Sequence, residues 1–165
     1  MKFVAEQSHM EAAIEAVLDR AFGPGRFAKS SERVREQGAV LERDLSRVAL
    51  TEAGAVVGVC RMWRVRAGEA ELLFLGPLAV DPSAQGEGVG AALAKEALAA
   101  ARAQGARGVV VMGREAFFGP LGFAPVPPGA ISLPGPYAAE RLLWLELAPG
   151  GLAAVRGTLS ARCRT

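Results

Sequence analysis

The spacing of apolar residues along the chain predicts strands and helices in alternation. After a short opening strand, apolar positions follow Ser8 with the period of a helix, and Ser8 and Glu11 have the spacing of a capping box. We expect that helix to end at Gly23-Pro24-Gly25 and a short second helix to run from Ser30 to Gly38. Apolar runs rich in β-branched residues predict strands at 2–6, 47–51, 55–65, 70–80, 108–112 and 141–147.

The run 70–80 is almost continuously apolar, which favours a central strand buried on both faces. Gly76-Pro77 interrupts it and predicts a bulge or a break, because proline cannot donate to the ladder. An alanine-rich helix is expected at 88–104, with Gly105 as its C-cap, and a short helix at 115–120. The proline-rich stretch 125–136 predicts a loop with a short strand near 130–133, and the sequence after Pro149 specifies little.

This order of elements, β-α-α-β-β-β-α-β-α-β, predicts an α/β (α+β layered) fold with a mixed sheet. The chain has 165 residues, with 51% apolar and 22% charged residues, so we expect a single domain over 1–165 with a packed core. The absence of a long apolar run and of a signal-peptide pattern leads us to expect a cytoplasmic protein without membrane contact.

Charge and metal-ligand content exclude several function classes. The net charge is +2 and no block of like charges occurs, so nucleic-acid binding has no support. The single histidine, His9, and the widely separated Cys60 and Cys163 offer no metal-site spacing, and we expect no metal.

The segment from Leu78 to Leu93 has the composition of an anion-binding turn. A strand ends, a turn follows, and three alternating glycines, Gly86, Gly88 and Gly90, open the predicted helix. Glycines let the backbone approach a ligand closely, and the free N–H groups of a helix N-terminus favour a phosphate. A glycine-rich helix start that binds nothing is the structural alternative.

Two ligand classes fit such a turn. Gly86, Gly88 and Ala91 satisfy the dinucleotide fingerprint GxGxxG/A. Five residues, 81–85, separate the strand from the first glycine, however, and the pattern lies mid-chain after a hairpin, which disfavours a dinucleotide fold. The following strand ends at Gly113-Arg114, and that arginine would suit a 2′-phosphate, so NADP stays an alternative.

The run PLAVDPSAQGEGVGAAL at 77–93 resembles motif A of the GNAT superfamily of N-acetyltransferases, with Gln85, Gly88 and Gly90 at the motif positions. FFGPLGFAP at 117–125 is similar to the segment after the fifth strand of these enzymes, and the closest likeness is to YhbS-like bacterial acetyltransferases. The resemblance implies a GNAT-like acyl-CoA N-acyltransferase fold. Its sheet would be mixed and mostly antiparallel, splayed between the fourth strand (70–80) and the fifth (108–112), with helices on both faces.

The resemblance also implies a cofactor site and a reaction. Acetyl-CoA would bind with its pantetheine arm along the end of the fourth strand and its pyrophosphate on the following amides, and its acetyl group would pass to an amine. The cofactor-binding residues implied are Leu78, Ala79, Val80, Gln85, Gly86, Glu87, Gly88, Val89, Gly90 and Phe118.

The catalytic groups are less defined. Glu71 or Glu69 could act as the base, with Glu71 better placed, although both could be surface carboxylates. Phe118 occupies the position of a tyrosine acid in many relatives, and the only tyrosine, Tyr137, lies in the proline-rich stretch. A catalytically weakened acyl-CoA-binding module is therefore an alternative. The acceptor amine is undefined, and the apolar final strand could support a homodimer.

Overall fold

The computed structural model describes residues 1–23 and 38–161. The strands are β1 (Lys2–Ala5), β2 (Val40–Leu41), β3 (Arg47–Leu50), β4 (Val56–Ala67), β5 (Ala70–Val80), β6 (Gly108–Met112), β7 (Ala124–Pro125), β8 (Ile131–Ser132), β9 (Leu142–Glu146) and β10 (Gly157–Ala161). The α-helices are α1 (Glu11–Phe22), α3 (Val89–Ala103) and α4 (Glu115–Phe118), and 3-10 turns are η1 (Ser8–Met10), η3 (Pro82–Ala84), η4 (Gly119–Leu121) and η5 (Ala139–Arg141).

The strands form one mixed, mostly antiparallel sheet in the order β1-β3-β4-β5-β6-β9-β7. The pairing of β5 with β6 is parallel, whereas β4 pairs antiparallel with β3, β5, β2 and β10. The long strands β4 and β5 form the centre, as the apolar runs in the sequence predicted. β9, the predicted final strand, lies between β6 and β7 and is not a free edge.

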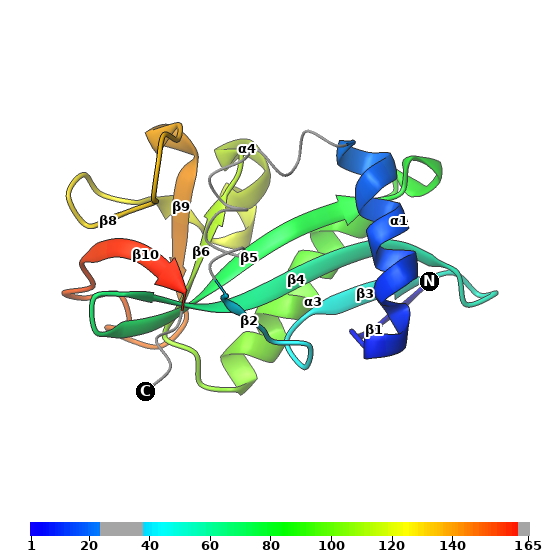
Figure 1. Cartoon of the computed structure of the whole chain (residues 1–165), viewed down its shortest axis with the longest axis horizontal. Helices are drawn as coiled ribbons and strands as arrows, with labels where there is room; N and C mark the ends of the chain where they lie inside the picture. Colours follow the sequence, from blue (N-terminus) through cyan, green and yellow to red (C-terminus); the bar gives the residue numbers. More distant parts are fainter. Residues whose placement is uncertain (24–37, 162–165) are drawn as a thin grey trace.

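Helices cover both faces of the sheet, as expected, with α1 on one side and α3 on the other (Figure 1). On β5, Leu73 and Leu75 contribute to the cluster under α3, while the alternate residues Leu72 and Phe74 belong to a cluster on the opposite face. The α1 side chains Ile14, Val17 and Leu18 are fully buried against Val48 and Val59. Each face of the central strands is therefore covered by apolar residues.

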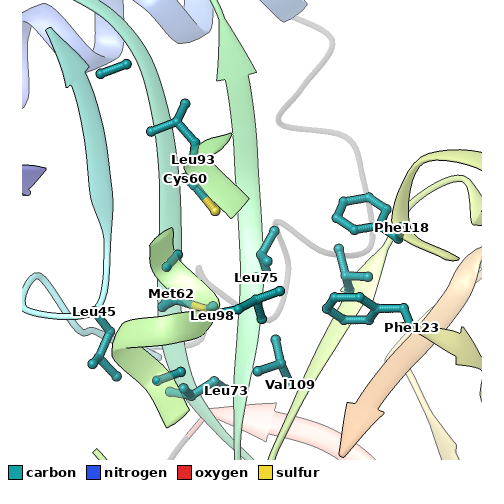
Figure 2. Packing of buried hydrophobic residues seen from close by; sticks show 14 of the residues in the cluster. Leu45, Cys60, Met62, Leu73, Leu75, Leu93, Leu98, Val109, Phe118 and Phe123 are labelled. Carbon is teal, nitrogen blue, oxygen red and sulfur yellow. The ribbon is translucent and has the colours of Figure 1, made fainter. Parts of the chain in front are cut away.

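The largest core cluster lies between α3 and the sheet (Figure 2). Leu93 of α3 lies beside Cys60 of β4, and Leu98 lies beside Met62 and Leu75 of the central strands. The buried residues of α3 recur with helical spacing, at Val89, Leu93, Ala94, Ala97, Leu98 and Ala101. The small alanines let α3 lie close to the strands, and this close packing fixes the position of its N-terminus.

The first helix begins later than the sequence predicted. Ser8–Met10 form a 3-10 turn without a side-chain cap hydrogen bond, and α1 starts at Glu11. The predicted capping box is wrong because the Glu11 carboxylate accepts a hydrogen bond from Arg61 of β4 instead. The second predicted helix, 30–38, falls mostly outside the described residues. The sequence also gave no indication of β10, which extends the edge of β4 and pairs with β8.

Candidate active site

The predicted bulge is present in β5 at Gly76-Pro77. Cys60 of β4 pairs with Leu78 and Met62 pairs with Leu75, so Arg61 alone faces the two residues Gly76 and Pro77. Gly76 has φ 137°, a backbone conformation that glycine adopts readily, and the Gly76–Pro77 peptide bond is cis. Beyond the bulge the alternation of faces is reversed, because Leu78 and Val80 now join the α3 cluster that Leu73 and Leu75 joined before it.

The two central parallel strands separate immediately after the bulge begins. The β5–β6 pairing runs from Leu73 with Val109 to Leu75 with Val111 and ends there. β5 continues beside β4, while Met112 of β6 continues beside β9. Figure 1 shows β5 and β6 diverging. Leu78–Val80 thus form a strand segment that is paired on the β4 side and has no strand on its β6 side among the described residues.

The direction of the backbone groups in this segment follows from one hydrogen bond. The amide of Asp81 donates to the carbonyl of Val57 on β4. The backbone N–H and C=O groups of successive strand residues point to opposite sides of the strand. The backbone groups of Ala79 therefore also point toward β4, and those of Leu78 and Val80 point toward the divergence. The amide and carbonyl of Leu78 and the amide of Val80 are therefore aimed where an extended ligand could pair with them. The Val80 carbonyl accepts from the side-chain amide of Gln85 at 3.1 Å.

The glycine segment forms a turn into the N-terminus of α3. Gly86 and Gly88 have φ 85° and 76°, and Gly88 is the N-cap in the left-handed conformation. A Cβ atom at either position would meet no heavy atom within 4 Å. The glycines are therefore needed for their backbone conformation, and the space beside the backbone at both positions is open. The first amides of α3, from Val89 to Ala91, have no intrahelical acceptor. This arrangement fits a pyrophosphate group.

The turn is anchored to the rest of the molecule through Asp81. Its carboxylate accepts from the amide and hydroxyl of Ser83, at 3.0 and 2.8 Å, and caps η3. Its other oxygen accepts from Arg20 of α1 at 2.6 Å. The bonds from Ser83, and then the one from Arg20, lower the pKa of the Asp81 carboxyl. The segment 81–85 thus links the end of β5, the end of α1 and the start of α3.

Phe117 and Phe118 of α4 have their rings edge to face, with centroids 4.8 Å apart, but they differ in burial. Phe118 is only 6% exposed, packs edge-on against Phe123, and covers Gly113 so closely that any side chain there would overlap its ring (Figure 2). Phe117 is 38% exposed, and its ring lies 3.8 Å from the position that a Cβ atom of Gly90 would occupy. Val80 lies 3.6 Å from the same position. Phe117, which sequence reasoning passed over, therefore borders the start of α3 and the end of β5.

The candidate acid–base residues do not gather at one point. Glu71 is at the start of β5, with its carboxylate 3.4 Å from a guanidinium nitrogen of Arg64. Four steps along the strand, roughly 13 Å, lead from Glu71 to Leu75, where the divergence begins. Glu69 is fully exposed in the preceding turn and contacts Arg66. Tyr137 packs against the cluster on the face opposite α3, away from the Phe118 ring.

A buried ionic cluster faces the bulge, and no sequence pattern indicated it. Arg61 is 5% exposed and donates to both carboxylate oxygens of Glu6, at 3.0 and 3.1 Å, and to Glu11 at 2.7 Å. Burial lowers the pKa of the Arg61 guanidinium, but the hydrogen bond and charge of Glu6, with the charges of Glu11 and Glu15, raise it more. Arg61 therefore stays charged, and the cluster ties β4 to β1 and α1 opposite Gly76-Pro77.

Two further observations concern the part of the chain that the structure describes. No group of three or more histidine, cysteine, aspartate or glutamate side chains there is arranged to hold a metal ion. No helix in residues 1–23 and 38–161 combines the length and the apolar character that a membrane span requires.

The geometry can now be compared with known proteins. The family model described as the acetyltransferase (GNAT) family matches residues 11–123, which include the diverging strands, the glycine turn and α4. The chain belongs to the GNAT acetyltransferase family. The sequence resemblance to this family and the predicted fold are thereby confirmed, whereas no curated protein matches the chain.

Two solved structures of GNAT proteins in complex with the coenzyme resemble the whole fold of this chain. The YhbS GNAT family N-acetyltransferase of Escherichia coli, in complex with CoA, is 26% identical, with TM-score 0.82 over 98% of this chain and 89% of its own. A GNAT family acetyltransferase of Brucella melitensis, in complex with acetyl-CoA, is 27% identical, with TM-score 0.70 over 98% and 96%. These relatives support acyl-CoA, and not a dinucleotide, as the ligand class of this chain.

A more distant relative shares the fold alone. The ribosomal-protein-S18-alanine N-acetyltransferase of Escherichia coli is 19% identical, with TM-score 0.63 over 89% of this chain and 94% of its own. The comparisons therefore define the family and the coenzyme, and they leave the acceptor undefined.

Proposed function

We propose that this protein is an N-acetyltransferase that transfers the acetyl group of acetyl-CoA directly to an amine. The observation that carries the proposal is the segment Leu78–Val80, which pairs with no described strand on its β6 side and leads through the glycine turn into α3. An extended amide-bearing arm and a pyrophosphate, joined in one molecule, match these two neighbouring features.

The coenzyme would be held mainly by backbone groups. Leu78 and Val80 pair with the pantetheine arm, and Ala79 keeps the segment attached to β4. The amides from Gln85 to Gly90 surround the pyrophosphate, with Glu87 exposed and the Val89 side chain buried beneath the turn. Phe117 forms the neighbouring apolar wall, and Phe118 supports α4 from the core.

The reaction needs no enzyme nucleophile. The neutral amine attacks the thioester carbonyl carbon, the C–S bond breaks, and coenzyme A leaves as a thiolate while the amine nitrogen loses a proton. We propose Glu71 as the group that accepts this proton. Because Glu71 lies four strand steps before the divergence, it would act through a chain of water molecules.

The test is acetyl-CoA-dependent release of free thiol, measured with a panel of small amines and peptides with free N-termini. The expected result is release above the background rate with at least one amine, together with an acetylated product of the corresponding mass. Binding of acetyl-CoA without thiol release for any amine would favour the weakened-module alternative. Failure to bind acetyl-CoA at all would overturn the proposed function.

The missing hydroxyl at position 118 is the observation that favours the alternative. A Phe118→Tyr variant separates the two possibilities when acetyl-CoA binding is intact. If protonation of the leaving thiolate limits the reaction, the variant raises kcat at least about tenfold. Unchanged kcat in an active protein would mean that a hydroxyl at this buried position does not act as the acid.

A further inference from the structure

The carbonyl of Gly76 lies outside the β4–β5 ladder. The register passes from Leu75 paired with Met62 to Leu78 paired with Cys60, and no cross-strand partner is assigned to Gly76 or Pro77. A backbone carbonyl at such a break must accept a hydrogen bond from a donor outside the ladder, because its burial without a hydrogen bond is unfavourable.

The indole of Trp63 supplies the missing donor. Its Nε1–H donates to the Gly76 carbonyl at 2.6 Å. Trp63 pairs with Phe74 across the β4–β5 ladder, so the indole reaches diagonally to the residue two positions further along β5. Diagonal contacts of this kind are within reach of a long aromatic side chain. A side chain of β4 thus holds the bulge at the carbonyl that the ladder does not use.

This contact lies where the coenzyme segment begins. Leu75 is the last residue of β5 that pairs with β6, and Leu78 is the first whose backbone faces the divergence. Only Gly76 and Pro77 lie between Leu75 and Leu78. Pro77 has no amide proton to donate. The Gly76 carbonyl is therefore a backbone group of this two-residue connection that a side chain can hold by a hydrogen bond.

We propose that Trp63 is a positioning residue for the acyl end of acetyl-CoA. By holding the Gly76 carbonyl, it sets the direction in which Leu78–Val80 leave the paired part of the sheet, and hence the alignment of the pantetheine arm. This inference rests on the proposed function, because it concerns the same acyl-CoA site. Trp63 is not expected to affect the pyrophosphate turn, which is held by Asp81 and α3.

The test is a Trp63→Phe variant, which keeps an aromatic ring and removes the N–H donor. Two probes are titrated: acetyl-CoA, and 3′-phosphoadenosine 5′-diphosphate, which has the pyrophosphate and lacks the pantetheine arm. We expect acetyl-CoA binding to weaken about 3- to 10-fold, in line with the loss of one hydrogen bond, and nucleotide binding to change less than about twofold.

Trp144 provides a matched control. It lies on the same face of the sheet, in the row formed by Trp63, Phe74, Val110 and Trp144, and no hydrogen bond of its indole is assigned within the described residues. Trp144→Phe is expected to leave the affinity for both probes unchanged. An equal response of the two tryptophan variants would overturn the proposal.

The remaining outcomes are also informative. Unchanged acetyl-CoA binding in Trp63→Phe, or equal weakening of both probes, overturns the positioning role while the proposed function stands. A wild-type protein that binds neither probe overturns the proposed function first. If Trp63→Phe does not fold, 3-benzothienylalanine at position 63 keeps the size of tryptophan without its N–H and allows the same comparison.

Discussion

Arg61 of β4 and Glu6, the residue after β1, form a nearly solvent-free ion pair with Nε and Oε1 3.0 Å apart. Removal of Glu6 would leave a buried guanidinium short of its principal partner. We expect Glu6→Ala to lower the free energy of unfolding by about 3–5 kcal/mol, measured by urea denaturation. The control is Glu69→Ala, which removes a fully exposed carboxylate and is expected to change stability by less than about 0.5 kcal/mol. Similar stability of the two variants would contradict a structural role for the pair.

Gly88 and Gly54 allow strain to be separated from ligand binding. Both have positive φ, 76° and 86°, and both have open space where a Cβ would be. We expect either alanine substitution to cost about 1–2 kcal/mol of stability. Only Gly88→Ala should also weaken acetyl-CoA binding, by at least about tenfold, because it disturbs the amides at the start of α3. Calorimetric titration of both variants checks this, and equal affinities would remove the turn from the site.

Phe117 and Phe118 should respond differently to truncation. Phe117 is partly exposed beside Gly90, so Phe117→Ala is expected to raise the KM for acetyl-CoA about 3- to 10-fold with little loss of stability. Phe118 is a core residue, and Phe118→Ala is expected to cost about 3–5 kcal/mol. Steady-state kinetics and thermal melting measure the two effects. A KM that is insensitive to Phe117 would place the coenzyme elsewhere.

Glu71→Gln tests the proposed base. If Glu71 accepts the amine proton through water, kcat falls about 10²-fold or more while the KM for acetyl-CoA is kept. Glu69→Gln, two residues away and also ion-paired to an arginine, is the control and should retain activity. Equal rates in both variants would exclude Glu71 from the chemistry without affecting the assignment of the coenzyme site.

Cys60 should make stability fall at alkaline pH. Burial raises the pKa of its thiol to about 12, although the charge of Arg47 opposes the shift. In the unfolded chain the thiol ionises near pH 8.5, so the unfolded state binds fewer protons between these two values and is favoured as the pH rises. The expected loss is about 2 kcal/mol by pH 10. Urea denaturation of wild type and Cys60→Ala across pH 7–10 measures it, and parallel curves would contradict the prediction.

Local patterns were sufficient to predict the centre of the molecule. The predicted β5 and α3 match the elements observed. Both elements are buried, so the apolar run of β5 and the alanine-rich pattern of α3 are compatible with few other structures. The bulge was also predicted, since Gly76-Pro77 excludes a regular ladder by chemistry alone. The glycines also predicted a turn at the start of α3, and its assignment to acyl-CoA rests on the family resemblance and stays a prediction.

The remaining features depend on partners distant in sequence. Glu11 had the spacing of a capping residue, but the charge of Arg61, fifty positions later, determines where its carboxylate lies. β10, with the sequence GTLSA, has little apolar alternation and is a strand because β4 and β8 offer it edges. Phe117 is more exposed than Phe118, and this difference likewise depends on how α4 packs against Gly113.

Among the described residues no strand pairs with the β6 side of Leu78–Val80, and the shortness of this side limits what can pair with it. Three residues span about 10 Å, which is shorter than an average strand. At one end Pro77 offers no amide proton, and at the other the Asp81 amide turns back to β4. A neighbouring polypeptide would therefore find too few contacts to add a strand here, so the exposed edge carries little risk of aggregation. A slender, amide-containing ligand needs only this length, so the sheet can stay open here without offering an edge long enough for another polypeptide.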